Sequence, residues 1–324
     1  MNVLITSVGT TTSIGVIKAL RMQSQLDVVL FGIDTNPEEL CAGASLVDCY
    51  SKFPTSLEKP GYEDRLLNFV LEHNIDCVIP IHDRELEVVS ELSKSVSHPC
   101  FWAVNSPEVI RQCNNKVSAS KIAESIGIKV PKIFFSLDEV DTYPIIAKPL
   151  FGVGSNGQYL IENIDDLISF SKKVQLGSYI LQEYILGEEF TVDCYSGYYS
   201  EFFSCLPRLR IQVKSGIVTK SRTCKNEQLY EYCHKLNAVM GLRGATNIQF
   251  IYSNHCYYFL EINPRFSGGG ILSYTAGFHS PLWTLQEASG KYVTNSVEKE
   301  YTYELIMTRY WTEVFHKRND RIII

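Results

Sequence analysis

Three polar side chains of different chemistry stand at alternate positions in the apolar segment FLEINPRFSGGG, residues 259–270. Glu261, Asn263 and Arg265 supply a carboxylate, an amide and a guanidinium. In an extended strand, a spacing of two residues places all three on one face, while Ile262 points to the other face and can pack. A polar row of this kind is not expected on a strand face that is buried in the hydrophobic core. The pattern therefore predicts that the row faces a ligand.

A second strand supplies further oxygen donors. The runs TNIQFIY and YYFLEIN flank the turn-like stretch SNHC, which is typical of a β-hairpin. If Tyr252 pairs with Tyr258, Gln249 lies opposite Glu261 and Asn247 lies opposite Asn263. Oxygen ligands without Cys or His select Mg²⁺ or Mn²⁺. A solvated sheet face is the alternative, but such a face seldom adjoins NPR and GGG, so we predict that Gln249, Glu261 and Asn263 bind metal.

A glycine-rich turn follows the strand that ends near Lys148, in IIAKPLFGVGSNGQYLI. Gly152, Gly154 and Gly157 allow positive φ and a close approach of the backbone to a ligand, and Ser155 adds a hydroxyl. Consecutive backbone N–H groups in such a turn form a concavity that binds anions. The turn indicates either a phosphate site beside Lys148 or an ordinary hairpin with three glycines.

The stretch LQEYILGEEF, residues 181–190, carries a second group of candidate nucleotide contacts. Glu183, Tyr184 and Ile185 end an apolar strand, where a carboxylate and backbone groups can meet an adenine. Glu189 follows the turn at Gly187 and can accept hydrogen bonds from ribose hydroxyls. The alternative for the two adjacent glutamates is a solvated surface pair.

The elements that position these residues change in character along the chain. The runs NVLITS, DVVLFGID, CVIPIHD and CFWAV alternate with amphipathic helical patterns in the first hundred residues, which predicts a parallel α/β sheet covered on both faces. The turn SVGTTTSIG could cradle a phosphate at a helix N-terminus, but it lacks both the GxGxxG and the GK signature, so an ordinary strand-to-helix turn is favoured. We expect a boundary near residue 113 and a mobile subdomain at about residues 130–183.

Composition narrows the class of protein. The 324 residues carry a formal net charge of −6, which argues against a general nucleic-acid binder. Ten cysteines form no CxxC pair and no metal-type Cys/His spacing, as expected for free thiols in a reducing cytoplasm. No basic leader precedes the first strand, and no apolar run approaches the roughly 20 residues that span a bilayer. We expect a cytoplasmic protein without nucleic-acid or membrane partners, and leave a homodimer open.

Together these motifs resemble the ATP-grasp superfamily, and most of all its carbamoyl-phosphate-synthase-like members. The resemblance rests on an ordered set that covers residues 1 to about 315: Lys116, Lys148, GVGSNG, QEYILGEE, NIQF and LEINPR. It implies a Rossmann-like pre-ATP-grasp domain at residues 1–112 and an α+β ATP-grasp domain at residues 113–300. The lid of the latter would span about 130–183, and residues 301–324 would form a C-terminal extension.

The resemblance also implies roles for individual residues. ATP would be bound by residues of the loop, the two lysines and the adenine and ribose contacts: Lys116, Lys148, Gly154, Ser155, Gly157, Glu183, Tyr184, Ile185 and Glu189. Gln249, Glu261 and Asn263 would coordinate Mg²⁺. Arg265 would stabilise the transferring phosphoryl group or the oxyanion that follows, and Gly268 and Gly269 would leave room for substrate.

A basic stretch lies between the ribose-binding and metal-binding segments. Residues 206–223, LPRLRIQVKSGIVTKSRT, contain five cations and no acid. Arginine suits bidentate binding of carboxylate or phosphate, so we predict that this stretch holds the substrate carboxylate or the γ-phosphate. Arg208 and Arg222 are the expected substrate contacts, and Arg210 and Lys220 the expected catalytic cations. The alternative is an exposed basic hairpin.

Two departures from the superfamily pattern qualify the resemblance. Leu150 follows KP, where relatives often carry a polar residue, and Gln249 is neutral where many members use a carboxylate. The neutral ligand weakens one metal site. The chain also carries a single ATP-grasp unit, whereas a full carbamoyl phosphate synthase needs two, so that overall reaction is not expected.

The resemblance implies an ATP- and Mg²⁺-dependent ligase that forms ADP. A substrate carboxylate would attack the γ-phosphate, and an amine would displace phosphate from the resulting acyl phosphate through a tetrahedral intermediate. Two readings stay open: a kinase-like ATP-grasp enzyme that stops at a phosphorylated product, and a non-catalytic nucleotide-binding sensor. The missing dinucleotide fingerprint disfavours a dehydrogenase.

Overall fold

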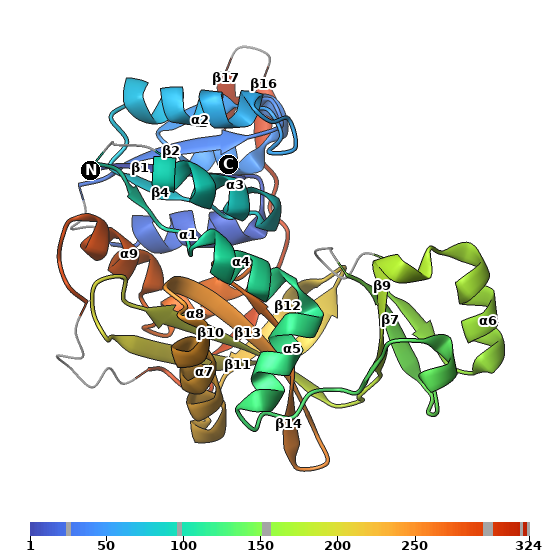
Figure 1. Ribbon diagram of the computed structural model, residues 1–324. Coiled ribbons are helices and arrows are strands. Elements are labelled where there is room, and N and C mark those ends of the chain that lie inside the picture. Colours follow the sequence, from blue (N-terminus) through green and yellow to red (C-terminus); the bar gives the residue numbers. More distant parts are fainter. Residues whose placement is uncertain (24–26, 96–98, 151–156, 294–300, 318–319, 323–324) are drawn as a thin grey trace.

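The N-terminal region forms a five-stranded parallel sheet (Figure 1). Its strands follow the order β3 (Cys49–Lys52), β2 (Val29–Asp34), β1 (Asn2–Ile5), β4 (Cys77–Ile79) and β5 (Phe101–Trp102). Val3 and Ile5 pack with helix α1 (Thr11–Arg21), whereas Leu4 packs on the opposite face with α2 (Gly61–Glu72) and α3 (Asp83–Ser95). Buried apolar runs covered on both faces thus give the expected parallel sheet.

The computed structural model describes residues 1–23, 27–95, 99–150, 157–293, 301–317 and 320–322. The four apolar runs quoted above lie at β1, β2, β4 and β5. Strand β3 was not among the expected runs, because its sequence CYSK is partly exposed and not apolar. The order β3-β2-β1-β4-β5 is one found in doubly wound sheets. The prediction of a mixed α/β fold is confirmed.

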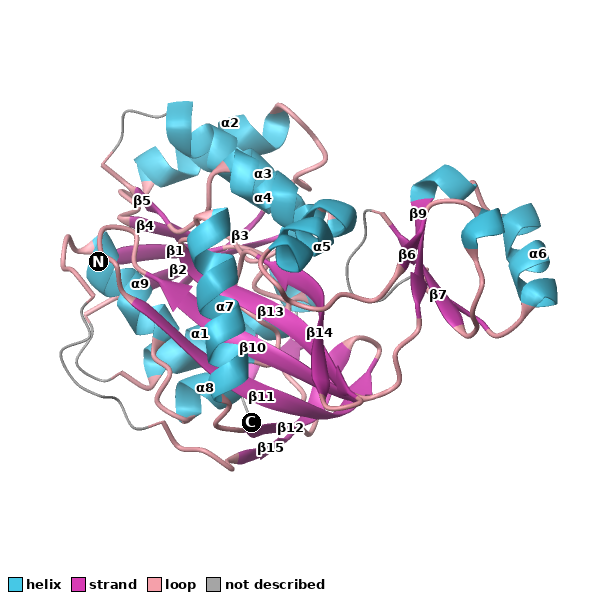
Figure 2. Cartoon of the chain, turned by 60° about the horizontal axis from the view of Figure 1, so that its bottom comes forward, coloured by secondary structure: helices cyan, strands magenta, loops and turns pink. Residues whose placement is uncertain are grey.

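A six-stranded sheet makes up the centre of the molecule (Figure 2). Its order is β14 (Cys256–Asn263), β13 (Gly244–Ser253), β10 (Glu188–Ser196), β11 (Phe203–Lys214), β12 (Ile217–Thr223) and β15 (Ile306–Thr308), with all neighbours antiparallel. Helix α7 (Glu227–Met240) packs on one face. Helices α8 (Gly270–Thr275) and α9 (Ser280–Ala288) contact this sheet and also helix α1. These contacts connect the central sheet to the N-terminal sheet.

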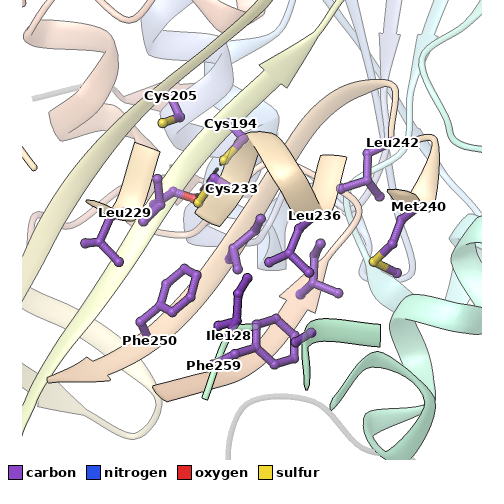
Figure 3. Close-up of a cluster of buried hydrophobic side chains, with 14 of the residues drawn as sticks. Ile128, Cys194, Cys205, Leu229, Cys233, Leu236, Met240, Leu242, Phe250 and Phe259 are labelled. Atoms are coloured by element: carbon purple, nitrogen blue, oxygen red, sulfur yellow. Dashed lines mark hydrogen bonds between the residues drawn. The ribbon is translucent and has the colours of Figure 1, made fainter. Parts of the chain in front are cut away.

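The core beneath α7 contains sulfur as well as hydrocarbon (Figure 3). Cys194 and Cys205 are paired residues of β10 and β11, and Cys233 of α7 lies against them. All three thiols are buried and free. Burial raises the pKa of Cys194 and of Cys233 well above the usual value. These cysteines serve as small apolar residues in the core, as free buried cysteines commonly do.

The hairpin of β13 and β14 has the polar residue pairs that the sequence predicts, and a bulge separates these pairs from the turn. Gln249 pairs with Glu261, and the pairing then shifts so that Tyr252 faces Tyr257 instead of Tyr258. The shift leaves Leu260 as an extra residue in β14. The turn at residues 254–255 has positive φ at both positions, as a tight two-residue hairpin turn requires. The register near the turn differs from the prediction, whereas the polar pairs are confirmed.

A small sheet stands apart from the rest of the molecule (Figure 1). It has the order β6 (Ile133–Phe134), β9 (Tyr179–Glu183), β7 (Ile145–Pro149) and β8 (Tyr159–Ile161), and α6 (Ile164–Lys173) packs on it. This unit lies where the lid was expected, and its mobility stays a prediction. The proposed boundary at residues 112 and 113 falls inside α4 (Pro107–Asn114), which is followed directly by α5 (Lys116–Ser125).

The C-terminal segment completes the central sheet. Strand β15 pairs with β12, and Arg309 N donates to the Thr219 carbonyl at 2.9 Å. A further short hairpin follows, β16 (Phe315–Lys317) and β17 (Asp320–Ile322). In the part of the chain that the structure describes, none of the helices has the length and apolar character that crossing a membrane requires.

A buried carboxylate holds several of these elements together. Asp193 of β10 accepts hydrogen bonds from Arg208 Nε at 2.7 Å and from Arg208 Nη2 at 3.2 Å. The hydroxyls of Ser267 and Ser273, before and within α8, also donate to it. Arg208 is 1% exposed and Asp193 4% exposed. A buried ion pair is tolerated only when its remaining polar atoms are satisfied, and Asp193 has such partners.

Asp193→Ala should lower the free energy of unfolding by about 3–5 kcal/mol, because it leaves a buried guanidinium without its counter-ion. Denaturant unfolding followed by circular dichroism measures this change. The matched control is Asp141→Ala, which removes an exposed ion pair to Lys132 and should cost less than about 1 kcal/mol. Equal effects of the two substitutions would contradict the structural role of Asp193.

Candidate active site

The polar row of β13 and β14 forms one hydrogen-bonded cluster around Glu261. Its Oε1 accepts hydrogen bonds from Gln249 Nε2 at 2.8 Å and from Asn263 Nδ2 at 3.2 Å. Gln249 Oε1 accepts from Arg210 Nη1 at 2.8 Å. The antiparallel pairing thus brings the three predicted metal ligands together and joins them to an arginine of β11.

Two lysines from different elements face this cluster. Lys148 lies on β7 of the small sheet and donates to Gln182 Oε1 at 2.9 Å, while Lys116 is the first residue of α5. Burial lowers the pKa of Lys148, and Lys116 lowers it further, whereas Glu261 and Glu189 act in the opposite direction. These four charges therefore lie within electrostatic range of one another. A buried, repelled ammonium group is stabilised by a bound anion.

The donor set around Glu261 fits a magnesium ion shared with a phosphate. Gln249, Glu261 and Asn263 offer oxygen atoms, but both amides would have to turn, because their nitrogen atoms now donate to Glu261. Among the described residues, no group of three or more His, Cys, Asp or Glu side chains is placed to hold a metal ion. Mg²⁺ commonly takes one or two carboxylates and completes its shell with phosphate and water.

Arg265 is held by Asp83 of the N-terminal region. Its Nε and Nη2 donate to Asp83, the first residue of α3, at 2.6 and 2.7 Å, and its Nη1 donates to the Phe266 carbonyl at 3.0 Å. Burial lowers the pKa of Arg265, but Asp83 and then Glu261 outweigh this effect and leave the pKa raised. Since a guanidinium has five N–H groups, two remain available to a ligand.

The expected adenine and ribose contacts lie at the junction of β9 and β10. The carboxylate of Glu183 accepts from the Lys132 backbone N–H at 3.1 Å. Tyr184 is exposed and Ile185 is half-buried. Glu189 begins the same face of β10 that carries Asp193, and its side chain is 47% exposed. The segment therefore leaves a carboxylate and an apolar side chain accessible next to the lysines.

The basic stretch divides between the two faces of the central sheet. Arg208 and Arg210 share a face with the polar row, and Arg210 Nε lies 3.5 Å from a carboxylate oxygen of Glu189. Arg222 pairs with the residue between these two arginines, so it lies on the opposite face, where it forms an ion pair with Glu304. Lys220 is exposed on that same opposite face. The structure does not bring Lys220 and Arg222 to the cluster.

The glycines serve close packing as much as substrate access. A Cβ at Gly269 would lie 2.4 Å from Arg208 Nη1, and a Cβ at Gly270 would lie 2.5 Å from the Tyr274 hydroxyl. Only Gly268 has comparatively open surroundings among these three, with Thr11 Oγ1 at 3.5 Å from such a Cβ. The predicted room for substrate therefore lies at Gly268, while Gly269 makes space for Arg208.

The glycine-rich loop lies largely outside the described residues, and this includes Gly154 and Ser155. Gly157 is described and has φ of +75°, a conformation that favours glycine. A Cβ there would also approach Pro149 Cγ to 3.2 Å. The loop's predicted contact with phosphate stays a prediction.

Comparisons with known proteins identify the fold of the chain. A sequence profile for the family described as ATP-grasp in the biosynthetic pathway with Ter operon matches residues 175–310. The biotin carboxylase domain of 2-oxoglutarate carboxylase from Hydrogenobacter thermophilus, solved with MgADP and bicarbonate, superposes with a TM-score of 0.75 at 16% identity. The superposition covers 94% of this chain and 73% of that one. The chain has an ATP-grasp fold.

Two curated relatives are similar to parts of this chain. A D-alanine–D-alanine ligase of Fusobacterium nucleatum subsp. nucleatum is 29% identical over 160 residues, 46% of this chain and 55% of the relative. A carbamoyl phosphate synthase large chain of Clostridium perfringens is 24% identical over 274 residues, 79% of this chain and 25% of the relative. The chain thus matches about half of the first relative and a quarter of the second. The predicted likeness to carbamoyl-phosphate-synthase-like ATP-grasp proteins is confirmed.

Sequence reasoning missed three charged residues that pair with or lie near the arginines of the candidate site. Asp83 ends the run CVIPIHD and thus stands at the tip of a parallel strand, a common place for functional groups. Asp193 stands in FTVDCYS, where an acid inside an apolar run is itself a signal of a buried partner. Arg309 carries no such signal, because only the pairing of β15 with β12 brings it to the sheet.

Glu261→Gln should abolish the Mg²⁺-dependent part of the stabilisation that ATP is expected to give this protein, because it removes the carboxylate of the row. Ligand at about 100 times its Kd stabilises a protein by about 2.7 kcal/mol, which a thermal-shift assay resolves readily. Glu188→Gln is the matched control, since Glu188 adjoins Glu189 in β10 but points to the other face. Retention of the Mg²⁺-dependent shift by folded Glu261→Gln would refute the metal assignment.

Proposed function

We propose that the protein is an ATP- and Mg²⁺-dependent ligase that activates a substrate carboxylate as an acyl phosphate for attack by an amine. The observation that carries the proposal is the cluster in which Glu261 accepts hydrogen bonds from two amides, Arg210 donates to one of them, and Lys148 lies within electrostatic range of Glu261. Such a cluster has positive charge to neutralise a triphosphate and oxygen donors for its metal ion. Phosphoryl transfer needs this neutralisation and alignment more than covalent help from the protein.

Each cation has a distinct place in the proposed reaction. Lys148, from the small sheet, and Lys116, from α5, would hold the phosphates from two sides. Arg210 already donates to Gln249, so it is oriented toward the metal row and the γ-phosphate. Arg265, fixed by Asp83, has two free N–H groups that would stabilise the oxyanion of the tetrahedral intermediate. Gln249, Glu261 and Asn263 would hold Mg²⁺, which would supply positive charge against the phosphates during transfer.

The relatives favour an acid and an amine as substrates. The Fusobacterium relative is named a D-alanine–D-alanine ligase, and the biotin carboxylase structure contains bicarbonate with MgADP. In both names the acid component is a small carboxylate or its equivalent. We therefore infer that small acids and amines are the partners of this protein, and amino acids are the first class to examine.

The nucleotide product tests this proposal. Incubation with Mg-ATP and a panel of amino acids, singly and in pairs, should release ADP and phosphate for the accepted acid, because an acyl phosphate forms by γ-phosphoryl transfer. Chromatography of the nucleotides and a phosphate assay measure both products. The Glu261→Gln variant should lower the rate by at least about a hundredfold, as for a lost group that stabilises the transition state. Release of AMP and pyrophosphate would indicate adenylation and overturn the mechanism.

A further inference from the structure

Three arginines of the central sheet retain buried nitrogen atoms without a hydrogen-bond partner in the described structure. These atoms are Arg208 Nη1, Arg210 Nε and Arg309 Nε. An unsatisfied buried N–H group costs free energy, and more so when it belongs to a charged group. Native structures rarely retain such groups unless a ligand or ion satisfies them. The arginines therefore point to an anion that binds between them.

Arg208 and Arg309 meet at two consecutive glycines. Arg309 Nη2 donates to the Gly268 carbonyl, and a Cβ at Gly269 would lie 2.4 Å from Arg208 Nη1. The two guanidinium groups thus approach the same short backbone segment from β11 and from the residue after β15. Thr11, the first residue of α1, borders Gly268 on the side of the N-terminal sheet. This end of the site is built from three distant parts of the chain.

The positive charges of Arg208 and Arg309 are not fully balanced by described carboxylates. Arg208 has Asp193 as its counter-ion, whereas Arg309 forms no salt bridge with any described residue. Burial lowers the pKa of Arg309, and the nearby Arg208 lowers it further. Like charges in a partly buried place repel one another unless an anion lies between them. No described residue supplies the missing negative charge, which points to an anion that binds there.

The region around Arg309 and Gly268 is distinct from the region around Lys148 and Glu261, where ATP would bind. Arg210 contacts Gln249 and lies near Glu189, which places it beside the metal row. Arg208 lies two residues further along the same face of β11, toward Gly269. The phosphates of ATP would occupy the side of Lys148 and Glu261. In the proposed reaction the activated carboxylate would lie beside the γ-phosphate and Arg210, so an anion at Arg309 would be a second one.

We propose that Arg309 and Arg208 bind a second anionic group of the acid substrate, a carboxylate or a phosphoryl group, so that the protein selects acids with at least two negative charges. The inference rests on the proposed function and narrows its substrate class. The planar fork of a guanidinium matches both carboxylate and phosphate in bidentate fashion. Arg309 thereby becomes a residue that determines specificity, supplied by the C-terminal segment.

Binding of matched acids to the complex with Mg-ADP tests this inference without requiring turnover. Glutarate carries two carboxylates, 3-phosphonopropionate carries a phosphonate and a carboxylate, and butyrate carries one carboxylate. At equal ionic strength, wild-type protein should bind one of the first two more tightly than butyrate, as measured by calorimetry. Arg309→Gln should weaken that dianion about tenfold, the loss of one charge-assisted contact, and change butyrate less than about twofold.

Two further variants separate specificity from folding. Arg309→Lys keeps the charge without the fork, so it should restore part of the preference for the dianion. Arg111→Gln removes an equal charge at a surface ion pair with Glu87 and should leave the preference unchanged. Equal affinity of wild-type protein for dianions and butyrate, or an unaltered preference in folded Arg309→Gln, would overturn the inference.

The inference and the proposed function fail in different ways. A preference for dianions that depends on Arg309 supports the second anionic subsite, even where no ADP is released with any acid. ADP release that is equally fast for monocarboxylates and dicarboxylates supports the ligase but overturns the subsite. The nucleotide assay and the binding assay therefore report on the two claims separately.

Discussion

An excess of buried positive charge is the constraint on which the rest of the site depends. Six cations gather on one face of the central sheet and its surroundings, against four carboxylates: Lys116, Lys148, Arg208, Arg210, Arg265 and Arg309 against Asp83, Glu189, Asp193 and Glu261. Burial lowers the pKa of Lys148, Arg210 and Arg309, so the free protein bears an electrostatic cost. Anionic ligands relieve that cost, and the fold serves to hold the cations in place until they bind.

The fold achieves this by fixing some of the cations and leaving others incompletely paired. Asp193 and Asp83 each accept two hydrogen bonds from one arginine, Arg208 and Arg265 respectively, and thereby set the direction of its remaining N–H groups. Lys148 lies on the small sheet that stands apart (Figure 1), whereas these arginines are tied to the body of the molecule. Fixed donors on the body, with the lysine proposed to bind phosphate on a separate unit, suit a reaction in which the nucleotide is enclosed before transfer.

The sequence predicts the parts of this site that depend on residues close together in the chain, and not the parts that depend on distant strands. The row of Glu261, Asn263 and Arg265 follows from a period of two, and its pairing with Gln249 follows from the short hairpin. The bulge at Leu260 has no such signature, because it depends on how the two strands twist and pack. Arg222 was grouped with Arg208 by composition, although the strand pairing places it on the other face. Arg309 could not be found at all, since its place depends on β15 joining a sheet whose other strands end by residue 263.

The central claim is that a substrate carboxylate attacks the γ-phosphate of ATP. In that step a carboxylate oxygen forms a bond to phosphorus, and the bond between this oxygen and the acyl carbon breaks when the amine attacks. An acid labelled with ¹⁸O in its carboxylate therefore tests the claim most directly, with mass spectrometry of the phosphate released alongside ADP. The account predicts one ¹⁸O atom in each phosphate from a single turnover with fully labelled acid. Phosphate without the label, released while acid and amine are joined, would contradict it.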